Sequence, residues 1–115
     1  MKLIGHLLVL TSLLAVVATG QATKKVTRAE ALSAISSKVE PDYPAVAKQL
    51  KVQGSVELDV LVTETGDVAK VDIVSGNPML TAPAAMAVKR WKFKPFNEDG
   101  KAVRVVAPIL LNFKL

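Results

Sequence analysis

Two acidic residues of this 115-residue chain, Glu57 and Asp59, have the type and spacing that could support chemistry. Two carboxylates on one face can divide the roles of general acid and general base. Here they alternate with Val56, Leu58 and Val60, which is the pattern of a strand with one buried face. That pattern places both carboxylates on the solvated face, so we interpret them as surface residues and not as a catalytic pair.

Residue types that other catalytic or metal sites need are scarce. The chain has no cysteine, so neither a disulfide nor a thiolate metal site is available. Its only histidine, His6, lies in a segment that we expect to be removed, which excludes a histidine-based triad or metal site in the mature protein. The glycines are scattered at turns and form no phosphate-binding loop. The sequence therefore predicts no enzyme, no cofactor and no metal.

A basic cluster follows the second predicted helix. It could contact nucleic acid or another anionic surface, or its cations could simply suit a helix C-terminus while the aromatic residues pack in the core. We favour the second interpretation, because an exported protein rarely meets nucleic acid. Without residues 1–22 the charge is 14 Lys+Arg minus 10 Asp+Glu, or +4, and it is spread along the chain. The cluster consists of Lys89, Arg90, Lys92 and Lys94, with Trp91 and Phe93 between them.

The first 22 residues have the composition of an export signal. Lys2 precedes a nearly continuous apolar run from Leu3 to Ala18, and small residues follow at the spacing that a signal peptidase requires. We expect cleavage after Gly20 or Ala22. The alternative is a short uncleaved anchor, since about 16 apolar residues fall just below a normal membrane span.

Residues 23–38 form a polar arm between the signal and the domain. Thr27 and Glu30 have the spacing of a capping box, which favours a short helix. The stretch from Ser33 to Val39 could equally be extended, and the sequence leaves the two interpretations open.

Residues 39–115 form one domain with the order helix, strand, strand, helix, strand. Alternating apolar residues predict a β-hairpin with a turn at Glu64–Asp67, and helical spacing predicts the second helix, which Thr81 could cap. A further turn is expected at Asn97–Gly100. The predicted elements are helix 44–50, strands 56–62 and 69–73, helix 80–92 and strand 103–115.

The final predicted strand contains a proline, Pro108. Proline cannot donate a ladder hydrogen bond, so it is confined to edge strands, strand starts or bulges. An exposed edge is a place where a partner can add a strand, which predicts a function in backbone pairing. Tyr43 and Pro44 could contribute a nearby contact, although packing over the helix start is the default role of Tyr43. The candidate binding residues on the strand are Arg104, Val105, Val106, Ala107, Ile109, Leu110, Leu111 and Asn112.

These elements together resemble the C-terminal domain of the TonB family of energy transducers. The resemblance covers about residues 39 to 115, and its two specific motifs are the start of the first helix and the end of the second. The matching stretches are Tyr43-Pro44-Ala45-Val46-Ala47-Lys48, Gln53-Gly54-Ser55-Val56, Thr65-Gly66-Asp67-Val68, Val74-Ser75-Gly76, Ala85-Met86-Ala87-Val88-Lys89-Arg90-Trp91-Lys92-Phe93-Lys94-Pro95 and the terminal strand.

The resemblance implies an α+β fold, with two helices packed on one face of a three-stranded antiparallel sheet. It implies a location facing the periplasm of a two-membrane bacterium. It also implies that the last strand pairs with a short extended segment of an outer-membrane transporter, in agreement with the argument from Pro108.

Two features depart from the family's pattern. Working transducers keep a membrane helix whose Ser and His, four residues apart, engage a proton-driven motor, whereas His6 and Ser12 have neither that order nor that spacing. Such transducers also carry a long Pro-rich spacer, and the 16 residues of the arm reach at most about 55 Å. We therefore expect the binding domain without the power coupling, and contact with inner-membrane motor proteins is left open.

Three hypotheses follow. The leading one is a secreted periplasmic domain that binds outer-membrane transporters or other envelope proteins by strand addition, with no nucleic-acid partner. The second is a short transducer anchored in the inner membrane and facing the periplasm. The third is a self-associating structural module, a homodimer formed through its edge strands.

Overall fold

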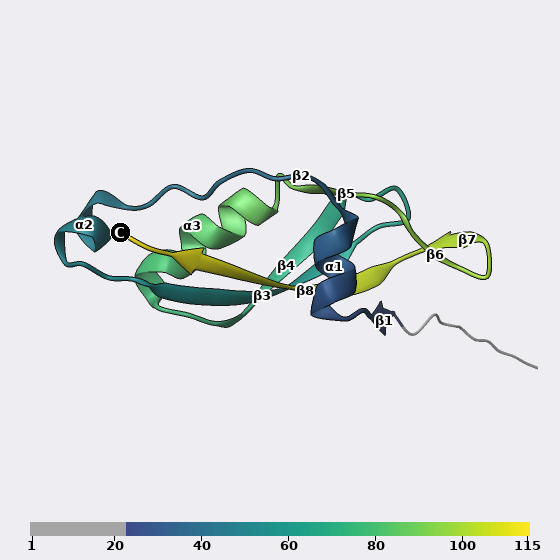
Figure 1. Cartoon of the computed structure of the whole chain (residues 1–115), viewed down its shortest axis with the longest axis horizontal. Coiled ribbons are helices and arrows are strands. Elements are labelled where there is room, and N and C mark those ends of the chain that lie inside the picture. Colours follow the sequence, from purple (N-terminus) through teal and green to yellow (C-terminus); the bar gives the residue numbers. More distant parts are fainter. Residues whose placement is uncertain (1–22) are drawn as a thin grey trace, which may run out of the picture.

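The computed structural model describes residues 23–115, which form three helices and a main sheet with two small sheets beside it (Figure 1). The predicted export signal, residues 1–22 with His6, lies outside the described residues. The helices are α1 (Arg28–Ala34), α2 (Ala45–Gln49) and α3 (Pro78–Val88). The main sheet consists of β1 (Lys24–Lys25), β3 (Gly54–Val62), β4 (Val68–Ser75) and β8 (Val105–Phe113).

The main sheet has the strand order β1-β8-β3-β4. β3 and β4 form the predicted hairpin, and β8 lies antiparallel on the other side of β3. Its register runs from Gly54 opposite Phe113 to Val62 opposite Val105. These three strands are the predicted antiparallel sheet. β1 adds a parallel partner for the first two residues of β8, which the sequence did not predict.

One face of the main sheet carries the hydrophobic core. Because side chains alternate between the faces of a strand, every second residue of β3 and β8 points to this face and is buried. All three helices contribute buried residues to the same cluster, so the predicted α+β fold with helices on one face is confirmed, and α1 is an additional helix. The central core residues are Val56, Leu58, Val60 and Val62 of β3, Val105, Ala107, Ile109, Leu111 and Phe113 of β8, and Ala31, Ala47, Leu80, Ala84 and Val88 of the helices.

Both interpretations of the arm are correct for different parts of it. Thr27 caps α1 in a complete capping box: its hydroxyl accepts from the N–H of Glu30 at 3.0 Å, and the Glu30 carboxylate accepts from the N–H of Thr27 at 2.9 Å. The chain then becomes extended as β2 (Ile35–Ser37), which pairs with β5 (Lys92–Phe93). Val26 and Ala31 are buried, so the arm packs against the domain.

α3 begins and ends earlier than the predicted range of 80–92. Its cap is Asn77, whose side-chain oxygen accepts from the N–H two residues later at 2.9 Å, and Pro78 occupies the first turn. Thr81 lies inside the helix and donates to the carbonyl of Pro78. At the other end, the N–H of Trp91 bonds to the carbonyl of Val88, three residues earlier. This tighter turn ends the α-helix before Trp91.

The predicted turn at Asn97–Gly100 is the tip of a small hairpin. Its strands are β6 (Phe96–Glu98) and β7 (Lys101–Val103), which pair only with each other. Asp99 and Gly100 both have positive φ, at 52° and 79°, the combination that a two-residue hairpin turn requires. In Figure 1 this hairpin lies at the opposite end of the molecule from α2 and the C-terminus.

The turn between β3 and β4 is hydrogen-bonded to β5 through Gly66. The Gly66 carbonyl accepts from the N–H of Phe93 at 2.9 Å, and a Cβ at Gly66 would lie 1.9 Å from the Phe93 carbonyl oxygen.

Gly66→Ala is therefore expected to destabilise the domain by about 3 kcal/mol or more, through both positive φ and backbone displacement. Gly100→Ala is the matched control: its φ is also positive, but nothing lies within 4 Å of the added carbon, so we expect a loss of about 1–2 kcal/mol. Urea unfolding of both variants checks this, and equal losses would contradict the close approach to β5.

Candidate partner-binding edge

One edge of β8 is bonded to β3. On the other side β1 pairs with only the first two residues of β8, and α1, which follows β1, packs against β8. The N–H of Val26 donates to the carbonyl of Val106 at 3.0 Å, so the backbone groups of Val106 face away from β3. Backbone groups alternate sides along an antiparallel strand, so those of Pro108, Leu110 and Asn112 face the same side as Val106. Within residues 23–115, no strand pairs with β8 on that side beyond Val106. We call the stretch from Pro108 to Asn112 the open edge of β8.

This alternation explains how β8 tolerates Pro108. Pro108 lies opposite Asp59 of β3, and its nitrogen, which carries no hydrogen, belongs to the open edge. The backbone groups of Ala107 and Ile109 on either side of it face β3. The ladder between β8 and β3 therefore loses no hydrogen bond at the proline.

The side chains of the predicted binding run divide between the two faces of the sheet. Leu110 is 38% exposed on the face opposite the helices, and Asn112 is exposed. The side-chain oxygen of Asn112 accepts a hydrogen bond from the hydroxyl of Ser55, the residue opposite it on β3. The run also contributes side chains to the core, from Val105, Ala107, Ile109 and Leu111.

Two ion pairs lie on the face of the sheet opposite the helices. Lys25 of β1 contacts Asp59 at 3.4 Å, and Arg28 of α1 contacts Glu57 at 3.3 Å. Both carboxylates belong to β3, so the cationic side chains of the arm extend across β8 to reach them. Glu57 and Asp59 thus pair with the arm, which suits their interpretation as surface residues.

Tyr43 and Pro44 lie at the C-terminal end of β8. The Tyr43 hydroxyl donates to the carbonyl of Val52, and its ring meets the edge of Phe113 with the ring centroids 5.5 Å apart. Pro44 is the residue that precedes the first turn of α2. Tyr43 therefore packs over the helix start as expected, and neither residue belongs to the stretch from Pro108 to Asn112; their contact with a partner stays a prediction.

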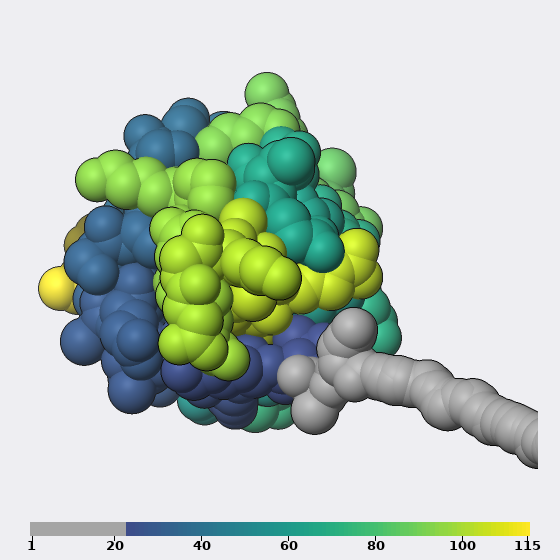
Figure 2. Space-filling model, turned by 90° about the vertical axis from the view of Figure 1, so that its right-hand side faces the viewer, coloured from purple at the N-terminus to yellow at the C-terminus, as the bar shows by residue number. Residues whose placement is uncertain are grey.

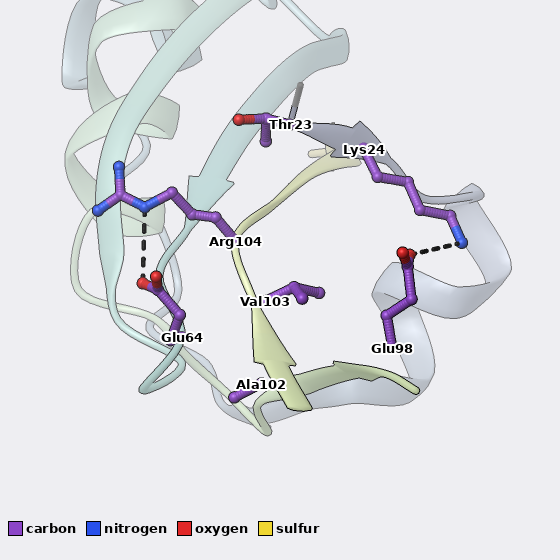
Figure 3. A pocket seen from close by; sticks show the side chains of 7 residues that line it. All are labelled: Thr23, Lys24, Glu64, Glu98, Ala102, Val103 and Arg104. Carbon is purple, nitrogen blue, oxygen red and sulfur yellow. Dashed lines mark ion pairs between the residues drawn. The ribbon is translucent and has the colours of Figure 1, made fainter. Parts of the chain in front are cut away.

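Arg104 lies just before β8, in the wall of a hollow of about 510 Å³. It contacts Glu64 at 3.5 Å on one side of the hollow, and Lys24 contacts Glu98 at 3.6 Å on the other, with Val103 between them (Figure 3). Figure 2 views this end of the molecule, where the β6–β7 hairpin stands beside the arm and the β3–β4 turn. The structure thus separates Arg104 from the open edge.

Comparison with known proteins assigns this fold to a family. The sequence profile of the Gram-negative bacterial TonB protein C-terminal family matches residues 39–115. The chain belongs to the TonB family. It is 32% identical over 83 residues to Protein TonB of Vibrio cholerae and 36% identical over 61 residues to Protein TonB of Escherichia coli. These alignments cover 70% and 51% of this chain but 34% and 26% of the relatives, so the chain spans about a third or less of their length.

Two solved structures share the fold of this TonB-family domain. The solution NMR structure of the Pseudomonas aeruginosa TonB C-terminal domain has a TM-score of 0.59 at 24% identity, and the match covers 70% of this chain and 84% of that one. The TonB2 protein from Vibrio anguillarum has a TM-score of 0.54 at 27% identity, covering 89% of this chain and 92% of that one. The resemblance inferred from the sequence is confirmed. The TonB family takes part in energy transduction in the envelope.

The basic cluster of the TonB-family domain surrounds a buried tryptophan. Trp91 is 2% exposed, and its indole N–H donates to the carbonyl of Val39 at 2.8 Å, while Lys38 lies 5.5 Å above its ring. Lys92 contacts Asp67 at 2.7 Å. The core role predicted for Trp91 is therefore confirmed by its burial.

Two carboxyl groups have lowered pKa values, and both lie away from the open edge. The hydrogen bond from Lys92 is the main cause of the lowered pKa of Asp67, and the hydroxyl of Thr65 adds to it. The backbone N–H of Thr27 lowers the pKa of Glu30, with a smaller contribution from the Thr27 hydroxyl. Asp67 lies in the turn between β3 and β4, and Glu30 lies in the capping box of α1, so the lowered pKa values reflect local hydrogen bonds.

Two further kinds of site are relevant to the described residues, a metal site and a membrane-spanning helix. In residues 23–115, no set of three or more His, Cys, Asp or Glu side chains is placed to hold a metal ion. The helices found there are all too short or too polar to cross a membrane. Sequence reasoning missed the pairing of β1 with β8 and the ion pairs of Glu64 and Glu98. The sequence held only an indirect signal for β1. The capping box at Thr27 marks the start of α1, so any strand in the arm before this helix must end by Val26.

Proposed function

We propose that this TonB-family domain is a periplasmic protein-binding module that takes part in transport across the envelope. It recognises outer-membrane transporters, or other envelope proteins, when an extended segment of the partner adds a strand to β8. The observation that carries the proposal is the open edge, where Pro108, Leu110 and Asn112 direct their backbone groups away from β3.

The open edge has the chemistry that strand addition requires. It offers the N–H groups of Leu110 and Asn112 as donors and the carbonyls of all three outward residues as acceptors. Main-chain hydrogen bonds of this kind supply affinity, and side chains next to the ladder supply selectivity. The exposed Leu110 side chain is an apolar contact for alternate side chains of the added strand.

Charge contributes little to this recognition. The acidic residues of β3 next to β8, Glu57 and Asp59, are already paired with Arg28 and Lys25. A partner strand therefore meets a neutralised surface around a backbone edge. We expect its binding to depend weakly on salt, because few unpaired charges are involved.

Amide exchange tests the proposal. The full chain is mixed with a synthetic peptide of the periplasmic N-terminal segment of an outer-membrane transporter, and exchange is followed by NMR. We expect the amides of Leu110 and Asn112 to become protected, because their N–H groups gain acceptors. The amide of Leu111, already bonded to β3, is the internal control and should not change. Unchanged exchange at Leu110 and Asn112 with bound peptide would mean that the partner binds elsewhere.

A further inference from the structure

β4 forms the second edge of the main sheet. Within the described residues it has β3 on one side and no strand on the other. The N–H of Thr63, just after β3, donates to the carbonyl of Asp67 at 2.8 Å. The odd-numbered residues of β3 therefore turn their backbone groups toward β4, because these groups alternate along the strand.

The outward groups of β4 follow from its register with β3. Lys70 and Asp72 lie opposite odd-numbered residues of β3, so their backbone groups face β3. Those of Val71 and Ile73 face outward. The edge has no proline and exposes apolar side chains, with Ile73 48% and Val74 52% exposed. An unpaired edge of this kind can pair with another chain.

We propose that β4 pairs antiparallel with β4 of a second copy of this chain, around a two-fold axis at Val71. Val71 then lies opposite itself in a hydrogen-bonded pair, since its N–H and carbonyl both face outward. Lys70 lies opposite Asp72 of the second copy, and the reverse pair forms across the axis.

The charged residues of β4 favour this register. They also favour a second copy of the chain as the strand that pairs with β4. Shifting the second copy by two residues in one direction, the smallest shift that keeps outward-facing backbone groups opposite each other, places Lys70 opposite Lys70 of the second copy. The shift in the other direction places Asp72 opposite Asp72. Like charges directly opposite each other destabilise a strand pair, and opposite charges stabilise it. Lys70 and Asp72 are exposed, at 66% and 62% of their side chains, and are 3.7 Å apart within one chain, so they lie on one face.

The proposed interface is small and is compatible with partner binding at β8. Register shifts between β3 and β4 bracket a regular stretch of β4 from Lys70 to Ile73, so the new ladder is short. We therefore expect a weak dimer with a small interface. β3 and β8 lie between the two edges, so the open edge of β8 stays free in both copies.

Charge exchange tests the proposal in solution. Sedimentation equilibrium of the full chain, purified from the envelope of an expressing bacterium, measures the dimer dissociation constant. Lys70→Asp places two acidic residues opposite each other at both pairs and should weaken dimerisation by about tenfold. The double variant Lys70→Asp, Asp72→Lys restores opposite charges and should return the constant to near that of the parent. A parent that stays monomeric, an unaffected Lys70→Asp variant or a failed restoration would each overturn the proposal.

A cysteine cross-link places the contact on β4 and not on β8. The chain has no cysteine, so a single introduced thiol reports one position. Val71→Cys brings two thiols together with Cα atoms about 5.5 Å apart, within the range of a disulfide. We expect an oxidised dimer for Val71→Cys on a non-reducing gel and a monomer for the matched edge variant Leu110→Cys. The reverse result would assign self-association to β8 and overturn the proposal.

Discussion

Leu110→Pro is expected to weaken binding of the transporter peptide by tenfold or more, while the free energy of unfolding changes by less than about 1 kcal/mol. The substitution removes an N–H that faces the open edge and bonds to nothing in the β3 ladder. It also places a ring where the partner backbone would approach. Titration calorimetry gives the affinity, and urea unfolding gives the stability.

The neighbouring position supplies the control for that variant. Leu111 directs its N–H toward β3 and its side chain into the core, where it is 9% exposed. Leu111→Pro should therefore destabilise the domain by about 3 kcal/mol or more. Similar behaviour of the two variants would show that both sides of β8 are structural, and the binding proposal would then be wrong.

Trp91→Ala is expected to lower the free energy of unfolding by about 3–5 kcal/mol. The indole is almost fully buried, packs beside Phe93 with the ring centroids 6.4 Å apart, and bonds to the carbonyl of Val39. The substitution leaves a cavity and an acceptor without its donor. Because Trp91 is the only tryptophan, circular dichroism and not fluorescence should follow the unfolding in urea.

Trp91→Phe separates packing from the hydrogen bond. Phenylalanine keeps most of the apolar volume but cannot donate to Val39, so we expect a loss smaller than that of the alanine variant. A nearly neutral alanine variant would place the indole outside the core. In that case the surrounding basic residues would again be candidates for an anionic surface.

The sequence predicted the elements whose burial follows a regular period. The β3–β4 hairpin and β8 were recognised because apolar residues alternate over many positions, and a half-buried strand needs that alternation. Pro108 predicted an edge, and the structure adds which side of β8 its nitrogen faces. The capping box at Thr27 was recognised for a different reason, because this motif is local and complete within four residues.

Elements without a period could not be predicted in this way. β1 is Lys24–Lys25, two charged residues whose side chains carry no sign of pairing, and β5 is only Lys92–Phe93. Such short strands are determined by long-range contacts. The end of α3 was predicted too late because Trp91 continues its apolar spacing, although the buried indole is reached after a tight turn. The two walls of the hollow around Val103 come from segments far apart in the sequence, so no local motif indicates them.

The pairing of β1 with the start of β8 sets a length limit for any strand that joins this edge. β1 occupies Val105 and Val106, which leaves Ala107 to Phe113, or about 23 Å of extended chain. A longer partner segment must turn away where it meets the arm, or displace Lys24–Val26 from the sheet. Under the proposed function, partners thus differ in affinity for two reasons: the sequence of the added segment, and the number of its residues that can pair with β8 before the segment meets the arm.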